Sequence, residues 1–141
     1  MGIKYNESNA VIVTEEANVI LKNCFITGGV VENNWPCLLC RNSTLNVSCS
    51  SIFQKLSSEA CYGTNSNINL FNNRIDSGEF SSCKVRSKKA TFVEELTLYN
   101  KTEFTGDRVD ILGRKNGKIN LFADSNSKIQ IDELCFGTTS I

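Results

Sequence analysis

The chain has 141 residues and carries 15 Lys and Arg against 15 Asp and Glu, with no His, so its formal net charge is zero. A balanced charge argues against a protein that binds nucleic acid or an anionic membrane surface, because those partners require a positive field. The lack of His excludes a histidine general base and histidine-ligated metal sites. No apolar run approaches the ~18 residues of a membrane-spanning helix, and the length fits one domain.

The first residues, Met1-Gly2-Ile3-Lys4, do not combine a basic segment with an apolar run, so no secretory signal is expected in them. This observation leaves the compartment open: a surface or extracellular location and a cytoplasmic one both remain possible.

Short runs of alternating apolar and polar residues dominate the chain, and helical periodicity is nearly absent. Such runs predict strands of about three to five residues, each with one face in a core and one face outward. The clearest runs are Val11-Ile12-Val13, Ile68-Asn69-Leu70, Leu96-Thr97-Leu98, Val109-Asp110-Ile111, Ile119-Asn120-Leu121 and Ile129-Gln130-Ile131.

A degenerate repeat links these runs: apolar, any, apolar, any, then Asn or a small residue. Its five copies begin at Val19, Leu45, Ile68, Leu96 and Ile119. They therefore recur about every 23–28 residues, which lies within the range of solenoid repeats. This spacing suits one coil of a three-sided solenoid, whereas the strands of a sandwich would recur at about 8–12 residues.

Seven cysteines are spread through the chain, and one pair, Cys37 and Cys40, has CxxC spacing. Three explanations stay open: buried core residues, redox or metal chemistry, and disulfides. Core packing is favoured because a second CxxC and any His are missing. A second set of positions that recurs at roughly the coil spacing also supports core packing, because its members would stack on an inner face of the solenoid. This predicted second column consists of Cys37 to Cys40, Cys61, Val85, Ile111 and Cys135. We therefore expect free, mostly buried thiols, no metal and no cofactor.

The fifth position of the repeat is expected to bend the chain. Asn tolerates the left-handed backbone of a sharp bend, and its amide can bond to the next coil. Asn23, Asn72 and Asn100 hold this position, while Cys49 and Ala123 interrupt the ladder.

With this pattern, the chain from position 9 to position 136 resembles the right-handed parallel β-helix proteins of pectate-lyase-like architecture. The resemblance implies an all-β solenoid of about five to six coils, each of about 23–28 residues. We expect a single domain over 1–141, with an arm or cap over 1–8 and a tail over 137–141.

β-Helix proteins include polysaccharide lyases and hydrolases, phage tailspikes, adhesins and scaffolds, so the fold alone does not choose a function. Cleaving members need clustered carboxylates or cations. The richest charged set here runs from Asp107 to Lys115, and no second carboxylate is expected beside Asp110 on adjacent coils. A solvated turn with local ion pairs explains this set better, and we assign no catalytic residue.

The outward positions of the repeat predict a binding strip. Phe71, Tyr99 and Phe122 would form an aromatic ladder at the ~4.8 Å spacing of parallel strands. Asn69, Thr97 and Asn120 would form a polar ladder beside it. The strip could hold a sugar chain, receive a partner subunit, or be covered by the same chain.

Two functions follow from these patterns. The first is a non-enzymatic structural or interaction module, a solenoid segment of a surface, secreted or scaffold protein that forms a homo-oligomer or binds a protein partner. The alternative is a domain that binds or cleaves carbohydrate. A carboxylate pair on adjacent coils beside a groove would favour the alternative.

Overall fold

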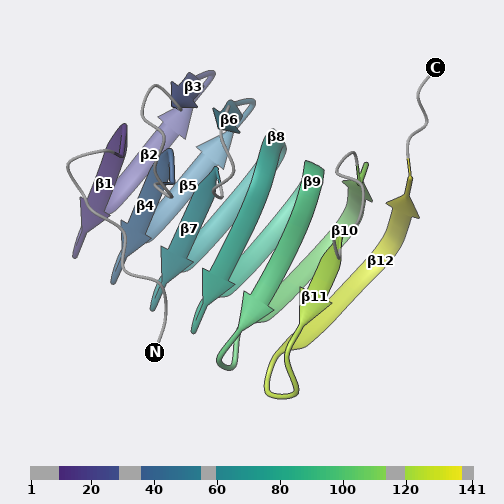
Figure 1. Ribbon diagram of the computed structural model, residues 1–141. Coiled ribbons are helices and arrows are strands. Elements are labelled where there is room, and N and C mark those ends of the chain that lie inside the picture. The colour runs from purple at the N-terminus through teal and green to yellow at the C-terminus, as the bar shows by residue number, and fades with distance from the viewer. Residues whose placement is uncertain (1–9, 29–35, 55–59, 114–119, 138–141) are drawn as a thin grey trace.

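The structure is a computed structural model that describes residues 10–28, 36–54, 60–113 and 120–137. Within these residues, twelve strands make up one continuous sheet that winds through about five turns, with every strand pair parallel (Figure 1). The predicted all-β parallel solenoid is therefore confirmed. None of the described residues belongs to a helix that is long and apolar enough to cross a membrane.

The chain passes in turn through three stacks of strands, which we call faces A, B and C. Face A stacks β1 (Ile12–Glu15), β4 (Leu38–Arg41), β7 (Cys61–Thr64), the end of β8 (Asn67–Ser81), the end of β9 (Lys84–Tyr99) and β11 (Leu121–Ala123). Face B stacks β2 (Asn18–Lys22), β5 (Thr44–Ser48), the starts of β8 and β9, and the starts of β10 (Glu103–Ile111) and β12 (Lys128–Phe136). Face C stacks β3 (Phe25–Gly28), β6 (Ser51–Gln54), the middles of β8 and β9, and the ends of β10 and β12.

The predicted repeat is correct for its first three copies and wrong for the fourth. Val19, Leu45 and Ile68 pair in register on face B, but the column continues through Val85, Phe104 and Ile129. Leu96 lies on face A instead, where it pairs with Gly78 and Leu121. The start of the fifth copy, Ile119, lies outside the described residues.

The missed coils are shorter than the repeats predicted from the sequence. The face B column steps from Ile68 to Val85 and then to Phe104, and each step is shorter than any offset between the predicted copies. In these coils Ser87 and Gly106 occupy the second apolar position of the repeat, so the pattern is hidden in the sequence.

The core is a column of inward side chains that alternates bulky and small residues. Phe80, Phe92 and Phe104 are almost completely buried. Gly63 and Gly78 make room for Phe80, because a Cβ atom on either glycine would lie 3.0 Å from the Phe80 ring. A side chain at Gly63 on the preceding coil, or at Gly78 on the same strand, would compete with the Phe80 ring for space in the close-packed interior.

Left-handed residues turn the chain between faces, as predicted. Asn23, Asn72 and Asn100 have φ angles of 56°, 55° and 52°. The single ladder predicted for them is wrong, however, because Asn23 and Asn72 turn the chain from face B to face C, whereas Asn100 turns it from face A to face B. Cys49 also has a φ of 51°, so it interrupts the amide ladder but not the bend.

Buried polar side chains that directly follow these bends stack from coil to coil. Between faces A and B, the Ala17 amide donates to Ser43 Oγ and the Ser43 amide donates to Ser66 Oγ, both at 3.1 Å. In the later coils the Thr102 amide donates to Ser127 Oγ at 3.2 Å. These bonds satisfy turn amides that would otherwise be buried without a partner.

All seven cysteines are free, as expected, and four of them are buried: Cys37, Cys40, Cys61 and Cys83. Burial raises the pKa of Cys37 and of Cys83 to about 11, so both thiols stay protonated at neutral pH. The predicted second column is correct from Cys37–Cys40 to Cys61, which lie on adjacent coils of face A, and wrong beyond Cys61. Val85 pairs on face B and Ile111 on face C, while Cys135 pairs with the outward Asp110.

Asp124 holds the face A to face B turn of the last coil. Its carboxylate accepts hydrogen bonds from the backbone amide of Asn100 at 2.8 Å and from the Ser127 hydroxyl at 2.8 Å. These bonds to the charged form lower the pKa of Asp124, with the Asn100 amide contributing most.

Asp124→Asn is expected to reduce the loss of stability in acid. A carboxylate whose pKa is lowered by folding stabilises the protein above its unfolded pKa, and the stabilisation is lost as pH falls through the folded pKa. The unfolded value is 3.8, so the melting temperature of the wild type should fall more steeply than that of the variant below about pH 4. Equal losses in both proteins, measured by thermal melts across that range, would contradict the role of this carboxylate.

Candidate functional site

The predicted binding strip does not form as one surface. Phe71 lies on face B between Ser48 and Lys88, whereas Tyr99 and Phe122 lie on face A. The Tyr99 and Phe122 rings do contact each other, with centroids 5.7 Å apart.

The predicted polar ladder is divided in the same way. Asn69 lies on face B, while Thr97 pairs with Phe122 on face A. Asn120 directly precedes β11, and its carbonyl accepts from the Leu96 amide at 2.9 Å. The predicted polar ladder is wrong for the same reason as the fourth copy of the repeat. The sequence pattern treats strands from face B and face A as copies of one strand.

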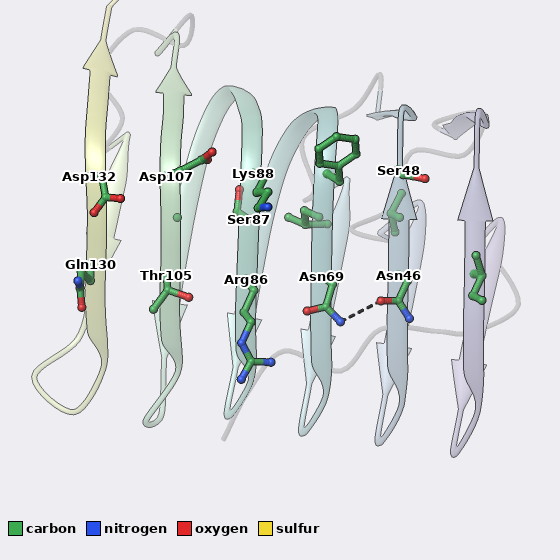
Figure 2. A pocket seen from close by; sticks show the side chains of 15 residues that line it. Asn46, Ser48, Asn69, Arg86, Ser87, Lys88, Thr105, Asp107, Gln130 and Asp132 are labelled. Atoms are coloured by element: carbon green, nitrogen blue, oxygen red, sulfur yellow. Dashed lines mark hydrogen bonds between the residues drawn. The ribbon is translucent and has the colours of Figure 1, made fainter.

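A groove of about 670 Å³ runs along face B instead, from the first coil to the last (Figure 2). Parallel coils are about 4.8 Å apart, so five steps between coils give it a length of roughly 24 Å. Two rows of outward side chains line it. The first row is Ile20, Asn46, Asn69, Arg86, Thr105 and Gln130. The second row is Ser48, Phe71, Lys88, Asp107 and Asp132.

The N-terminal half of the groove is neutral and amide-rich. Asn69 Nδ2 donates to Asn46 Oδ1 at 2.9 Å, which fixes the orientation of both amides (Figure 2). Phe71 stands beside them with 49% of its surface exposed. An exposed ring next to oriented amides offers one apolar contact and several directed hydrogen bonds to the same ligand.

The C-terminal half is charged, and the charges are ordered along the axis. Arg86 and Lys88 project from one coil, Asp107 from the next, and Asp132 from the last (Figure 2). Asp107 and Asp132 occupy corresponding positions between the pairs Gly106–Ile131 and Arg108–Glu133. They form a carboxylate pair on adjacent coils, which the repeat pattern of the sequence does not predict.

The charged set singled out from the sequence divides between this groove and face C. On the adjacent coils Asp110 pairs with Thr91 and Cys135, so neither residue paired with it is a carboxylate, as expected. Arg108 forms ion pairs with Asp110 at 3.3 Å and Glu133 at 3.4 Å, as expected for a solvated turn. Asp107 alone of this set lines the groove, and Arg114 and Lys115 lie outside the described residues.

Asp107 is held in its charged form. Its carboxylate accepts bonds from the amides of Arg108 and Lys89, the latter at 3.1 Å, and Lys88 lies nearby. The Arg108 amide is the largest cause of its lowered pKa. A general acid needs a raised pKa near neutral pH, so Asp107 is suited to accepting hydrogen bonds and unsuited to donating a proton.

Within the described parts of the chain, no group of three or more Cys, Asp or Glu is placed to hold a metal ion. Cys37 and Cys40 of the CxxC are both buried in the core, and Cys40 Sγ contacts Ser66 Oγ at 3.5 Å. We still predict that a chelator leaves the unfolding temperature of the protein unchanged.

Sequence reasoning found two of the groove residues as binding candidates, Asn69 and Phe71, and missed the others. One signal was available: in Val85-Arg86-Ser87-Lys88 and Phe104-Thr105-Gly106-Asp107 the alternation persists if Ser and Gly are accepted as inward residues. Compared with family models, curated proteins and solved structures, the chain shows no significant match.

Proposed function

We propose that this protein is a non-catalytic β-solenoid module that binds an extended glycan in the face B groove. The observation that carries the proposal is the pair of in-register rows of outward amide, hydroxyl and charged side chains along that groove. A carboxylate pair on adjacent coils beside a groove favours carbohydrate over the protein-association alternative. Glycan recognition also agrees with the resemblance to pectate-lyase-like β-helices. As part of this proposal, we expect the solenoid to wind in a right-handed sense, as it does in those proteins.

The spacing of the groove favours a sugar chain over a peptide. The coils repeat at about 4.8 Å, which is close to the advance of one unit in an extended β-linked sugar chain. A peptide strand lying along the same axis would present side chains on one side every ~6.6 Å, out of step with the coils. Polar groups that recur once per coil can therefore contact successive sugar units equivalently.

Binding without cleavage is favoured by the environment of Asp107, which does not suit this carboxyl to the role of general acid. Glycoside hydrolysis requires one carboxyl that is protonated near neutral pH and a second that is charged. Bonds from two backbone amides keep Asp107 charged. We therefore propose that Asp107 and Asp132 accept hydrogen bonds from sugar hydroxyls or amides.

Asn69→Ala combined with Phe71→Ala is expected to weaken binding to glycans at least tenfold, because the pair supplies an oriented amide and the exposed ring. The measurement is binding of wild type and variant to an array of neutral and acidic oligosaccharides, with calorimetry of each one retained. Tyr99→Ala combined with Phe122→Ala is the matched control on face A and should leave affinity unchanged. Failure of the wild type to bind any oligosaccharide, or loss only in the face A variant, would overturn the proposal.

Association with a protein partner or a second copy stays a prediction. Its support is the last coil, where the inward residues Ile129, Leu134 and Phe136 are 38%, 38% and 54% exposed. Edge strands with exposed apolar side chains are used in other proteins for pairing between chains.

A further inference from the structure

The first and last described coils are open sheet edges. Among the described residues, β1, β2 and β3 pair only with β4, β5 and β6, and β11 and β12 pair only with β9 and β10. Proteins commonly protect such edges with proline or with charged side chains that point inward. Neither interrupts β2, β3 or β12 within the described chain, so each edge can accept another parallel strand.

The two edges have the same spacing between faces B and C. On the last coil the inward residues Ile129 and Phe136 lie seven positions apart, and on the first coil Val19 and Ile26 also lie seven positions apart. The coils between them keep this spacing in their paired residues. A second copy placed one coil step (~4.8 Å) beyond β12 would therefore put Val19 against Ile129 and Ile26 against Phe136 at the same time.

The inward side chains of the last coil lack a covering coil. Phe104 and Ile111 on β10 are at most 1% exposed, whereas their partners Ile129 and Phe136 on β12 are 38% and 54% exposed. The first coil of a second copy would bury these apolar side chains as β12 buries those of β10.

The outward residues on face A also match across such a contact. Phe122 would lie beside Val13 of the second copy, because both belong to the same column of paired residues. Both side chains are exposed in the single chain, at 39% and 36%. Stacking would therefore remove two further apolar groups from water.

Opposite charges would meet at the contact in this register. Lys22 pairs with Ser48, so it begins the second row of the groove, and Asp132 ends that row (Figure 2). Both side chains are exposed. Stacking places Lys22 of the second copy beside Asp132, as an opposite-charge pair on neighbouring strands. Two copies joined by the same edge would not form this pair, because its members lie on different edges.

One pair of like charges opposes the contact. Asp124 directly follows β11 and Glu15 ends β1, so stacking brings these carboxylates to the same corner. Glu15 is already bound by Arg41 at 2.8 Å, and Asp124 accepts hydrogen bonds within its own turn. Because the corner is open to solvent, the repulsion is screened and is smaller than the gain from burying the apolar edge.

We propose that the C-terminal edge, formed by β11 and β12, stacks on the N-terminal edge, formed by β1 to β3, of a second copy. Copies joined in this way form one continuous solenoid. The contact is heterologous and leaves one edge free at each end, so it builds open filaments and not closed dimers. Each copy adds β2, β5, β8, β9, β10 and β12 to face B, which gives an axial repeat of ~29 Å at ~4.8 Å per coil. The inference goes beyond glycan binding and does not depend on it.

Charge reversal tests this register by sedimentation velocity. The wild type should form a series of oligomers that lengthens with concentration. Lys22→Glu or Asp132→Lys should raise the concentration needed for assembly about fivefold, because each variant places like charges together at the contact. The two changes combined should restore assembly to within about twofold of the wild type, since they recreate an opposite-charge pair.

Arg74→Glu is the matched control for charge reversal. It makes the same change of charge as Lys22→Glu at an exposed residue of a middle coil, where Arg74 pairs with Ser51 and Thr91. It should leave assembly unchanged. Melting temperatures of the dilute proteins show that each variant is folded.

Phe25→Cys gives a second test, because position 25 of one copy would pair with Cys135 of the next. Cys135 is a free thiol, and paired Cα atoms at ~4.8 Å lie within the range that a disulfide spans. Oxidation by air with copper phenanthroline should link copies into dimers, trimers and longer species, and peptide mapping should find position 25 joined to Cys135. Ser51→Cys, in the same outward column but one coil further from the contact, is the matched control and should give much less of this product.

A wild type that stays monomeric at every concentration would overturn the inference, and so would a closed dimer that does not grow. Equal assembly of the wild type and both single charge reversals would overturn the register, as would disulfides that join Cys135 only to Cys135. Each of these results leaves the glycan proposal standing. Conversely, failure to bind any oligosaccharide would leave stacking unaffected.

Discussion

Phe80→Ala is expected to lower the free energy of unfolding by about 3–5 kcal/mol, the range for removing a fully buried phenylalanine. Phe80 is 0% exposed and fills the space that Gly63 and Gly78 leave in the solenoid interior. The neighbouring coils are tied by continuous parallel pairing, so they cannot collapse into the cavity. Urea denaturation followed by circular dichroism measures the change.

Two further variants separate cavity formation from a general effect of losing a ring. Phe122→Ala removes a ring that is 39% exposed on face A, so it should cost about 1 kcal/mol or less. Gly63→Ala places a methyl group where Phe80 and Ile68 now lie, at 3.0 and 2.7 Å, so it should destabilise the wild type. In the Phe80→Ala background the same methyl should cost less or stabilise, because it refills part of the cavity. Equal losses in both backgrounds would contradict this packing.

The fold could be predicted from the sequence because its determinants are local. Alternation in runs such as Ile68-Asn69-Leu70 identifies strands, and their recurrence identifies coils. The left-handed bends at Asn23, Asn72 and Asn100 could be predicted for the same reason, since only the backbone preference of one residue is involved.

The site could not be predicted in the same way, because it depends on register. Ser87 and Gly106 face inward where the repeat demands aliphatic residues, and this departure hid two whole coils. When those two coils are not recognised, Tyr99 and Phe122 are aligned wrongly with Phe71, and Arg86 and Lys88 are not identified as groove residues. In a solenoid, an alignment that is wrong by part of a coil places later side chains on the wrong face, as it did for Leu96. The strands whose inward residues broke the repeat also carry the outward Arg86, Lys88 and Asp107 of the groove.

Asn73 illustrates a second limit of sequence reasoning. It follows Asn72 directly, and the sequence does not indicate which of the two amides is buried. The structure places Asn72 in the exposed bend and leaves Asn73 only 3% exposed. Asn73 Oδ1 accepts from the Ser50 amide at 3.1 Å, and its Nδ2 donates to the Val47 carbonyl at 2.9 Å.

Asn73→Ala is therefore expected to cost about 2–4 kcal/mol of unfolding free energy, since it removes both of these hydrogen bonds and leaves the buried Ser50 amide without a partner. The Ser50 amide should also exchange its hydrogen faster, which a non-specific loss of packing would not confine to this site. Asn67→Ala is the matched control, because Asn67 is an exposed asparagine earlier on β8 and should change stability by no more than about 0.5 kcal/mol. If the two alanine variants are equally stable, the side-chain ladder between faces B and C does not hold the coils together. In that case the parallel backbone pairing alone would have to fix the register on which the groove depends.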